Sequence, residues 1–296
     1  MKKVLKGDRV GYFYILPALL FMFLFIFFPV IYNTIISLQD VTVSTLLSED
    51  KAFVGLANYI SVLQSKEFLN SLTVTVIFTI ACIVFQFFFG FLLAMIFKKN
   101  TRPFQLMKAI MMVPYIIPAT VNAILWKFFF ATKGGIINEA LLALGLIKDR
   151  IGWLNQPKTA VVSIIVANIW CGIPFFMILL STGLSNVPKD FYESARMDGA
   201  NAFQRLIFIT IPNIKTSIQA SLVLGIVYTF RCYELVYVMT AGGPVDSTQL
   251  MTLYSYKYSF VTYNFSQGAT ISNILLLILL AVGLLYIKMM GKDEVM

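Results

Sequence analysis

Long apolar runs dominate the chain, in place of apolar positions spaced as on an amphipathic helix or strand. The runs lie roughly at residues 11–38, 72–97, 107–130, 159–184, 216–239 and 269–289. A run of about 18 or more apolar residues is long enough to cross a bilayer as an α-helix. The pattern therefore predicts an all-α fold, a polytopic membrane helix bundle of six transmembrane helices.

The first run follows a basic start, as the core of a signal peptide does. It is too long for such a core and is not followed by a small-residue cleavage site, so we expect a retained anchor helix. The chain is then a single transmembrane domain, 1–296, with a peripheral anchor helix at about 11–38. We expect a core bundle at about 70–290 and a polar loop at about 185–212.

Composition supports a membrane protein and sets its orientation. Hydrophobic residues make up 59% of the chain and charged residues only 12%, which excludes an ordinary soluble domain. The net charge of +9 does not indicate nucleic acid, because fourteen Lys and Arg residues fall on the side of the two termini and seven on the other side. By the positive-inside rule, we expect both termini in the cytoplasm and membrane lipid around the spans.

The residue types present leave little room for catalysis on this chain. Histidine is absent, and the three cysteines lie inside apolar runs without CxxC spacing, so we expect no metal site and no catalytic residue. No G-x-x-x-x-G-K-[ST] motif occurs, so any nucleotide hydrolysis must take place on another chain.

Two runs contain residues that interrupt helices. Pro114 and Pro118 lie in the third run, and Gly172 and Pro174 lie in the fourth. Broken helices inside a membrane are tolerated where they line a cavity or pack against protein. A simple kink remains an equally good explanation for any one proline, but the four residues together favour a pathway through these spans.

The loop at 186–212 predicts two short helices. Asn186 or Ser185 is placed to cap the first, Gly199 to end it, and Pro212 to end the second. The first helix is too short to insert into a membrane, yet it carries apolar side chains that need a partner, for which a cytosolic protein is the natural candidate. These side chains are Phe191, Tyr192 and Ala195.

The same loop resembles the EAA loop of the membrane-spanning subunits of binding-protein-dependent ABC importers. The matching residues are Glu193-Ser194-Ala195, Asp198-Gly199-Ala200 and Ile211-Pro212, with Ser194 in place of the usual alanine. Further segments are similar to the larger permease of the carbohydrate importers for maltose and glycerol phosphate. They are Leu16-Pro17-Ala18, Phe28-Pro29, Phe53-Val54-Gly55 with Asn58-Tyr59, Trp153-Leu154 and Thr240-Ala241-Gly242-Gly243-Pro244.

The resemblance implies the fold of a type I ABC importer permease in a prokaryotic cytoplasmic membrane. It implies three kinds of protein partner: a second, related permease, an ATPase dimer and an extracytoplasmic sugar-binding protein. ATP and Mg²⁺ would bind the ATPase, with no cofactor on this chain. The residues it assigns to ATPase coupling are Glu193, Ser194, Ala195, Asp198, Gly199, Ala200 and Pro212.

The resemblance also implies positions for a sugar site on spans 4 and 5. They are Cys171, Gly172, Phe175, Gly225, Tyr228, Thr229 and Cys232. Aromatic rings suit the apolar faces of sugars, although packing against lipid or neighbouring helices is the ordinary role of an aromatic in such spans.

Three other features have two interpretations each. Arg231 and Glu234 either contribute polar groups to a pathway or, as we favour, form an i,i+3 pair on one helix. Lys127 is best explained as an anchor at the outer interface. Gly242-Gly243-Pro244 is either an outer turn or a docking point for the binding protein.

These observations predict a transmembrane subunit of an ATP-driven carbohydrate importer, with an oligosaccharide as substrate. The alternative is a secondary sugar carrier driven by an ion gradient, which predicts inverted repeats and a buried coupling carboxylate, for which Glu234 is the sole candidate. An intramembrane enzyme is a third class, but no intramembrane Asp pair, His or GxSxG motif supports it.

Overall fold

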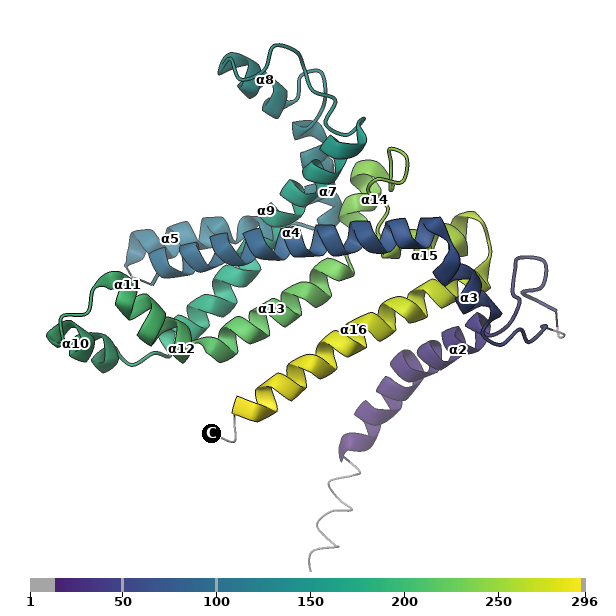
Figure 1. Ribbon diagram of the computed structural model, residues 1–296, viewed down its shortest axis with the longest axis horizontal. Helices are drawn as coiled ribbons and strands as arrows, with labels where there is room; N and C mark the ends of the chain where they lie inside the picture. The colour runs from purple at the N-terminus through teal and green to yellow at the C-terminus, as the bar shows by residue number, and fades with distance from the viewer. Residues whose placement is uncertain (1–13, 49–50, 99–100, 294–296) are drawn as a thin grey trace, which may run out of the picture. The chain divides into compact units, whose positions relative to one another are not determined.

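The computed structural model describes residues 14–48, 51–98 and 101–293, which form helices joined by loops (Figure 1). The predicted all-α fold is confirmed. The helices divide into two compact units, one formed by residues 1–65 and 254–276 and the other by residues 66–253 and 277–296. The predicted start of the first span, at residue 11, lies outside the described residues.

Four helices in the described residues are long and apolar enough to cross a membrane: Tyr14–Ser37, Lys66–Ile96, Pro157–Ser185 and Phe265–Lys288. Two further spans are bent pairs of helices. Arg102–Ile116 and Ala119–Phe129 meet at 95°, and Ala202–Asn213 and Lys215–Phe230 meet at 70°. If each bent pair is counted as one span, the six predicted runs each correspond to one span.

The first unit consists of α2 (Phe28–Ser37), α3 (Ala57–Gln64) and the first part of α16 (Phe265–Asp293). Buried polar side chains connect these helices. Asn273 of α16 donates hydrogen bonds to Ser37 Oγ and to Tyr59 Oη, both at 3.1 Å. Since lipid offers no hydrogen-bonding partner, such a network holds an apolar anchor helix in one register.

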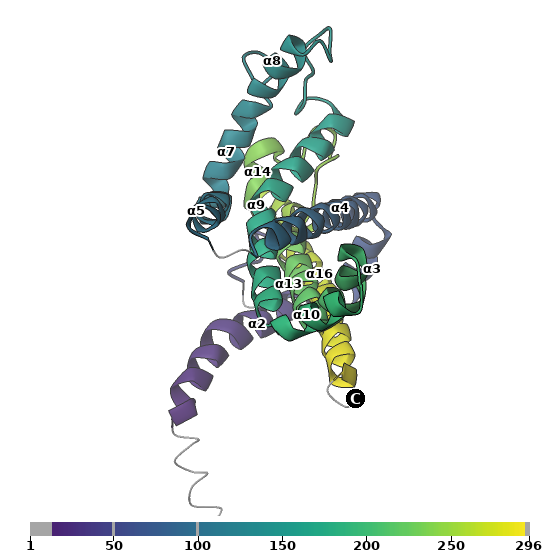
Figure 2. The same cartoon turned by 90° about the vertical axis from the view of Figure 1, so that its left-hand side faces the viewer.

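The second unit is built around two long helices that pack along each other, α4 (Lys66–Ile96) and α9 (Pro157–Ser185). Its other helices are α5 (Arg102–Met111), α6 (Val113–Ile116), α7 (Ala119–Phe129), α8 (Ile136–Ala143), α10 (Lys189–Met197), α11 (Ala202–Arg205), α12 (Ile211–Asn213), α13 (Lys215–Phe230) and α14 (Glu234–Thr240). The boundary between the two units falls within α15 (Met251–Tyr256). Figures 1 and 2 show α8 and α10 at opposite ends of this unit, which we call the α8 end and the α10 end.

Close packing between α4, α9 and α13 depends on small residues facing large ones. Phe176 of α9 is fully buried, and a Cβ on Gly90 of α4 would lie 2.5 Å from its Cβ. A Cβ on Gly225 of α13 would lie 2.4 Å from its Cζ. The ring therefore fills the space that two glycines leave, which is the usual way in which membrane helices approach closely.

The prediction that the fourth span is broken at Gly172 and Pro174 is wrong. Pro174 lies inside α9, which continues unbroken over 29 residues. A proline is tolerated inside a membrane helix when neighbouring helices, side chains or local adjustments of the backbone satisfy the carbonyl group that it leaves without a hydrogen bond. The bent spans of this unit are the third and the fifth.

Candidate functional site

The bend in the third span is stabilised by a buried asparagine. Ile117 is extended (ψ 133°), as expected for a residue before a proline, and Pro118 is the N-cap of α7. Asn122, only 2% exposed, donates from Nδ2 to the carbonyl oxygens of Pro114 at 2.9 Å and of Ile117 at 3.2 Å. Both carbonyls are exposed by the break, so the side chain supplies the bonds that the interrupted helix has lost.

The fifth span has a second interruption between α13 and α14. Arg231 follows the last residue of α13, and Glu234 is the first residue of α14. The carbonyl oxygen of Cys232, between them, accepts a hydrogen bond of 2.6 Å from Thr252 Oγ1. The chain at this point is irregular, yet its polar backbone is bonded within the protein.

A cavity of about 460 Å³ lies where these two interruptions face α9 and α4. All seven residues expected at a sugar site line it: Cys171, Gly172, Phe175, Gly225, Tyr228, Thr229 and Cys232. The structure thus brings together side chains that are up to 61 positions apart in the chain, from Cys171 to Cys232. Their role in binding stays a prediction.

Three aromatic rings from three spans form one wall of the cavity. Phe175 of α9 stacks on Tyr115 of α6, with ring centroids 6.2 Å apart, and meets Tyr228 of α13 edge-on at 5.4 Å. Tyr228 is 62% exposed, so most of its ring is not used in packing. An accessible ring of this kind offers a flat apolar surface beside a hydroxyl group.

Polar groups that the sequence analysis did not select lie on other sides of the cavity. Gln86 of α4 donates from Nε2 to both the carbonyl oxygen and Oδ1 of Asn168 on α9, each at 2.9 Å. A Cβ on Gly172 would lie 2.2 Å from that Nε2, so the glycine makes room for the glutamine. Asn122 also lines the cavity. The sequence signal that could have found these residues is the presence of amide side chains inside strongly apolar runs.

Arg231 and Glu234 also line the cavity, and the pairing we favoured for them is wrong. Both side chains are described by the structure, and they form no ion pair with each other. The i,i+3 geometry needs a continuous helix, whereas α13 ends before Arg231 and α14 starts at Glu234. The cavity wall therefore carries one positive and one negative group, both exposed.

At the α10 end, the polar loop forms the predicted helix and turn. Gly199 follows α10 with φ +78°, and the amide of Ala200 donates to the carbonyl of Ala195 at 2.8 Å. Asn201 and Gln204 then cap α11 reciprocally. The predicted N-cap at Ser185 or Asn186 is wrong, because Ser185 is the last residue of α9 and Pro188 occupies the cap of α10.

The coupling residues expected in this loop lie together on its surface. Glu193, Ser194, Asp198, Gly199 and Pro212 are exposed, and Ala195 and Ala200 are half-buried. Pro212 lies in α12, one residue before the end of the helix Ala202–Asn213, close to where the sequence predicts that end. Large apolar side chains are exposed beside them, namely Phe191, Met197, Phe203 and Phe208. Tyr192 is instead half-buried, with its hydroxyl group 3.1 Å from Thr210 Oγ1.

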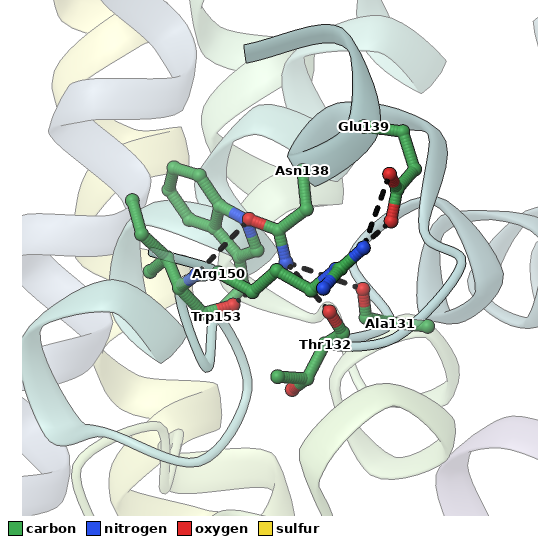
Figure 3. Close-up of polar contacts among 7 residues, drawn as sticks. Ala131, Thr132, Asn138, Glu139, Arg150 and Trp153 are labelled. Carbon is green, nitrogen blue, oxygen red and sulfur yellow. Dashed lines mark hydrogen bonds and ion pairs between the residues drawn. The ribbon is translucent and has the colours of Figure 1, made fainter. Parts of the chain in front are cut away.

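At the α8 end, a fully buried asparagine organises the loop between the third and fourth spans (Figure 3). Asn138 donates to the carbonyl of Ile151 at 2.9 Å and accepts from Trp153 Nε1 at 3.0 Å. Beside it, Arg150 donates to Glu139 at 3.0 Å, and this bond holds the pKa of that carboxyl below its usual value. Gly242-Gly243-Pro244 forms a turn at the end of α14.

Long apolar helices, bends stabilised from within and a cavity between them define a membrane transport protein. A family model described as "Binding-protein-dependent transport system inner membrane component" matches residues 86–289. That range is more than half of the chain, and the chain belongs to this family. It is thus a multi-pass permease subunit of an ABC importer and not an enzyme.

Named relatives cover nearly the whole chain. The chain is 32% identical to the "Trehalose/maltose transport system permease protein MalF" of Thermococcus litoralis over 284 residues, which cover 96% of this chain and 94% of that protein. It is 30% identical to the "Lactose transport system permease protein LacF" of Rhizobium radiobacter over 274 residues, or 91% and 90% of the two chains.

Solved structures share the fold. A chain of a bacterial alginate ABC transporter, crystallised with an alginate pentasaccharide-bound periplasmic protein, matches with a TM-score of 0.81 at 21% identity. The match covers 96% of this chain and 94% of that chain. The type I ABC importer permease fold expected from the sequence is therefore confirmed.

Proposed function

We propose that the chain is a transmembrane subunit of an ATP-driven importer of carbohydrate, with an oligosaccharide as substrate, and that the cavity of about 460 Å³ holds part of that sugar. The single observation that carries the proposal is the composition of this cavity. Aromatic rings on one wall and amide side chains on the others match what a sugar needs, namely flat apolar surfaces and a few fixed hydrogen-bonding groups.

The size of the cavity and the names of the relatives support the same substrate class. Small-molecule sites measure about 300–1,000 Å³, and this cavity lies in that range. Relatives are named for trehalose, maltose and lactose, and the alginate transporter has the same fold. Because few charged or hydrogen-bonding groups are present, binding would be weak, as release on the other side of the membrane requires.

A second permease chain would complete the pathway. The cavity is open rather than enclosed, and Tyr228, Arg231 and Glu234 in its wall are exposed. Family resemblance supports a related permease as the chain that faces these residues, forming a heterodimer. The two permeases would then share the sugar between them.

Energy would enter through the loop at the α10 end. Exposed Phe191 lies two residues before exposed Glu193 on α10, which at nine residues is too short to span a membrane. An ATPase subunit that binds ATP and Mg²⁺ would cover this surface, and its closure would move α10 and the adjoining spans. An extracytoplasmic sugar-binding protein would dock at the opposite, α8 end, and both termini would be cytoplasmic.

ATP-dependent uptake into membrane vesicles supplied with a sugar-binding protein tests this proposal. Phe175→Ala and Tyr228→Ala each remove an aromatic contact worth on the order of 1 kcal/mol. We expect uptake to fall about fivefold or more in each variant, with the amount of inserted protein unchanged. Phe128→Ala is the matched control, because Phe128 is 69% exposed and does not line the cavity.

Two results would count against the proposal. Unchanged uptake in both cavity variants would show that sugar does not bind in this cavity. Uptake driven by an ion gradient without any ATPase would favour the secondary carrier that the sequence left as an alternative.

A further inference from the structure

A second cavity, of about 230 Å³, lies at the α10 end and plays no part in the proposed sugar pathway. It is lined by the end of α4 and the two residues that follow it, by α5 and by the last turn of α9. Its lining residues are Ala94, Phe97, Lys98, Phe104, Gln105, Lys108, Ser181, Leu184 and Ser185.

The lining of this cavity is basic and rich in hydrogen-bond donors. Lys98 and Lys108 contribute two positive charges, and no acidic residue is among the lining residues. Neither lysine forms an ion pair with another residue that the structure describes. Ser181 Oγ is buried with no hydrogen-bond partner among the described residues. Two ammonium groups and a free hydroxyl group are suited to a compact anion, above all a phosphate group.

The floor and the surroundings of the cavity are apolar. Phe97 and Phe104 meet edge-on with ring centroids 6.1 Å apart, and Leu184 is buried beside them. On α5, which carries Lys108, the neighbouring side chains Leu106 and Ile110 are exposed by 65% and 57%. A positive cavity next to an exposed apolar surface matches a molecule with a phosphate group and hydrocarbon chains.

The position along the spans agrees with this chemistry. The apolar helix α4 ends at Ile96, two residues before Lys98, and α9 ends at Ser185. The cavity thus lies where two spans leave the hydrocarbon region, at the depth of lipid headgroups. Basic pockets between transmembrane helices on the cytoplasmic side are a known setting for anionic headgroups.

Lys98 also connects the cavity to the loop proposed to bind the ATPase. Its Nζ lies 3.9 Å from the ring centroid of Tyr192 on α10. An anion in the cavity would attract the same ammonium group, so the occupant and the ring of Tyr192 would share one cation. Binding of an anion in the cavity would therefore change the contact between Lys98 and Tyr192, and with it the position of α10.

We propose that this cavity binds the phosphate group of an anionic phospholipid, and that Lys98, Lys108 and Ser181 recognise it. A free phosphate ion shares this chemistry, but the exposed apolar surface of α5 favours the lipid. The proposal rests on the proposed function in one respect only, namely that the cavity lies on the cytoplasmic side of the membrane.

The test measures lipid retention by the full chain, purified from membranes with the subunits that copurify. The protein is reconstituted in nanodiscs of phosphatidylcholine containing a minor fraction of phosphatidylglycerol, and bound lipid is counted by native mass spectrometry after extraction. We expect enrichment of phosphatidylglycerol and a loss of roughly tenfold in that enrichment for Lys98→Gln/Lys108→Gln. Lys148→Gln/Lys158→Gln, which removes the same charge at exposed positions remote from the cavity, should retain the enrichment.

Further arms identify the source of the phosphate and guard against misfolding. Lys98→Arg/Lys108→Arg keeps both charges and should retain the lipid, and Ser181→Ala should weaken retention without changing charge. Equal retention by the glutamine variant and its control would overturn the proposal. Displacement of the lipid by millimolar inorganic phosphate would also overturn it, in favour of a site for the free ion. Because retention is read without transport, a failed uptake assay does not affect this result.

Discussion

Replacing Gly225 with alanine should destabilise the second unit, because the new methyl group would clash with the buried ring of Phe176. The added Cβ would lie 2.4 Å from Cζ and 3.0 Å from Cε2 of Phe176, and 3.0 Å from Cδ1 of Ile83. Phe176 is fully buried, and its own Cβ faces Gly90 at close range. Phe176 therefore packs closely against α4 at its Cβ and against α13 at its ring.

The expected magnitude is the difference of two effects. Overpacking a well-filled core costs about 1–3 kcal/mol, and alanine in place of glycine in a helix returns up to about 1 kcal/mol. Because the added methyl group would approach a fully buried side chain so closely, we take the upper part of the first range and expect a net loss of about 2 kcal/mol. Gly283→Ala is the matched control, since no atom lies within 4 Å of its added Cβ in α16, and it should stabilise by about 0.5–1 kcal/mol.

The assay measures the thermal unfolding temperature of the purified protein with its copurifying subunits. A second measurement gives the amount of each variant that is inserted in membranes. Shortening the ring with Phe176→Leu should recover part of the loss in the Gly225→Ala background. A double-mutant cycle should give an interaction energy of about 0.5–3 kcal/mol. If Gly225→Ala unfolds at the same temperature as Gly283→Ala, or if Phe176→Leu adds its full cost in both backgrounds, the steric argument fails.

Two further predictions concern the loop and the cavity charges. Glu193→Ala and Gly199→Val should abolish uptake while insertion stays normal, because one removes an exposed carboxylate and the other adds about 1–2 kcal/mol of backbone strain at φ +78°. Gly145→Val, at φ +68° in the α8-end loop, is the control, and equal loss of uptake in that variant would contradict a specific role for Gly199. Arg231→Met and Glu234→Gln should change the amount of inserted protein additively, within about 0.5 kcal/mol, because the two side chains do not pair. A double variant much milder than the sum would restore the pair.

The six spans were predictable because length and hydropathy alone determine whether a helix can cross a bilayer. Where the helices break was harder to predict. Pro118 lies at the bend of the third span, yet Pro174 leaves α9 continuous. The break between Arg231 and Glu234 carries neither proline nor glycine, so no local signal marked it. For that reason the pairing of the two charges was predicted wrongly.

The seven positions expected at the sugar site came from family resemblance, and the structure places all of them around one cavity. Gln86, Asn122 and Asn168 were not found, because each contributes through a partner far away in sequence or through a carbonyl freed by a bend. Such roles depend on tertiary contacts that no spacing rule describes. An amide inside an apolar run was nevertheless a usable warning, since a buried polar group needs a partner.

The unbroken course of α9 gives the second unit a rigid lever. Its 29 residues extend about 44 Å, with Trp153 and Asn138 just before one end, the cavity at its middle and α10 just after the other end. A tilt of about 10° about the middle would move each end by roughly 4 Å in opposite directions. A push on α10 would thus reach the α8 end with no change of helical structure. Because α9 is continuous across Pro174, a movement at one of its ends would be transmitted to the other end.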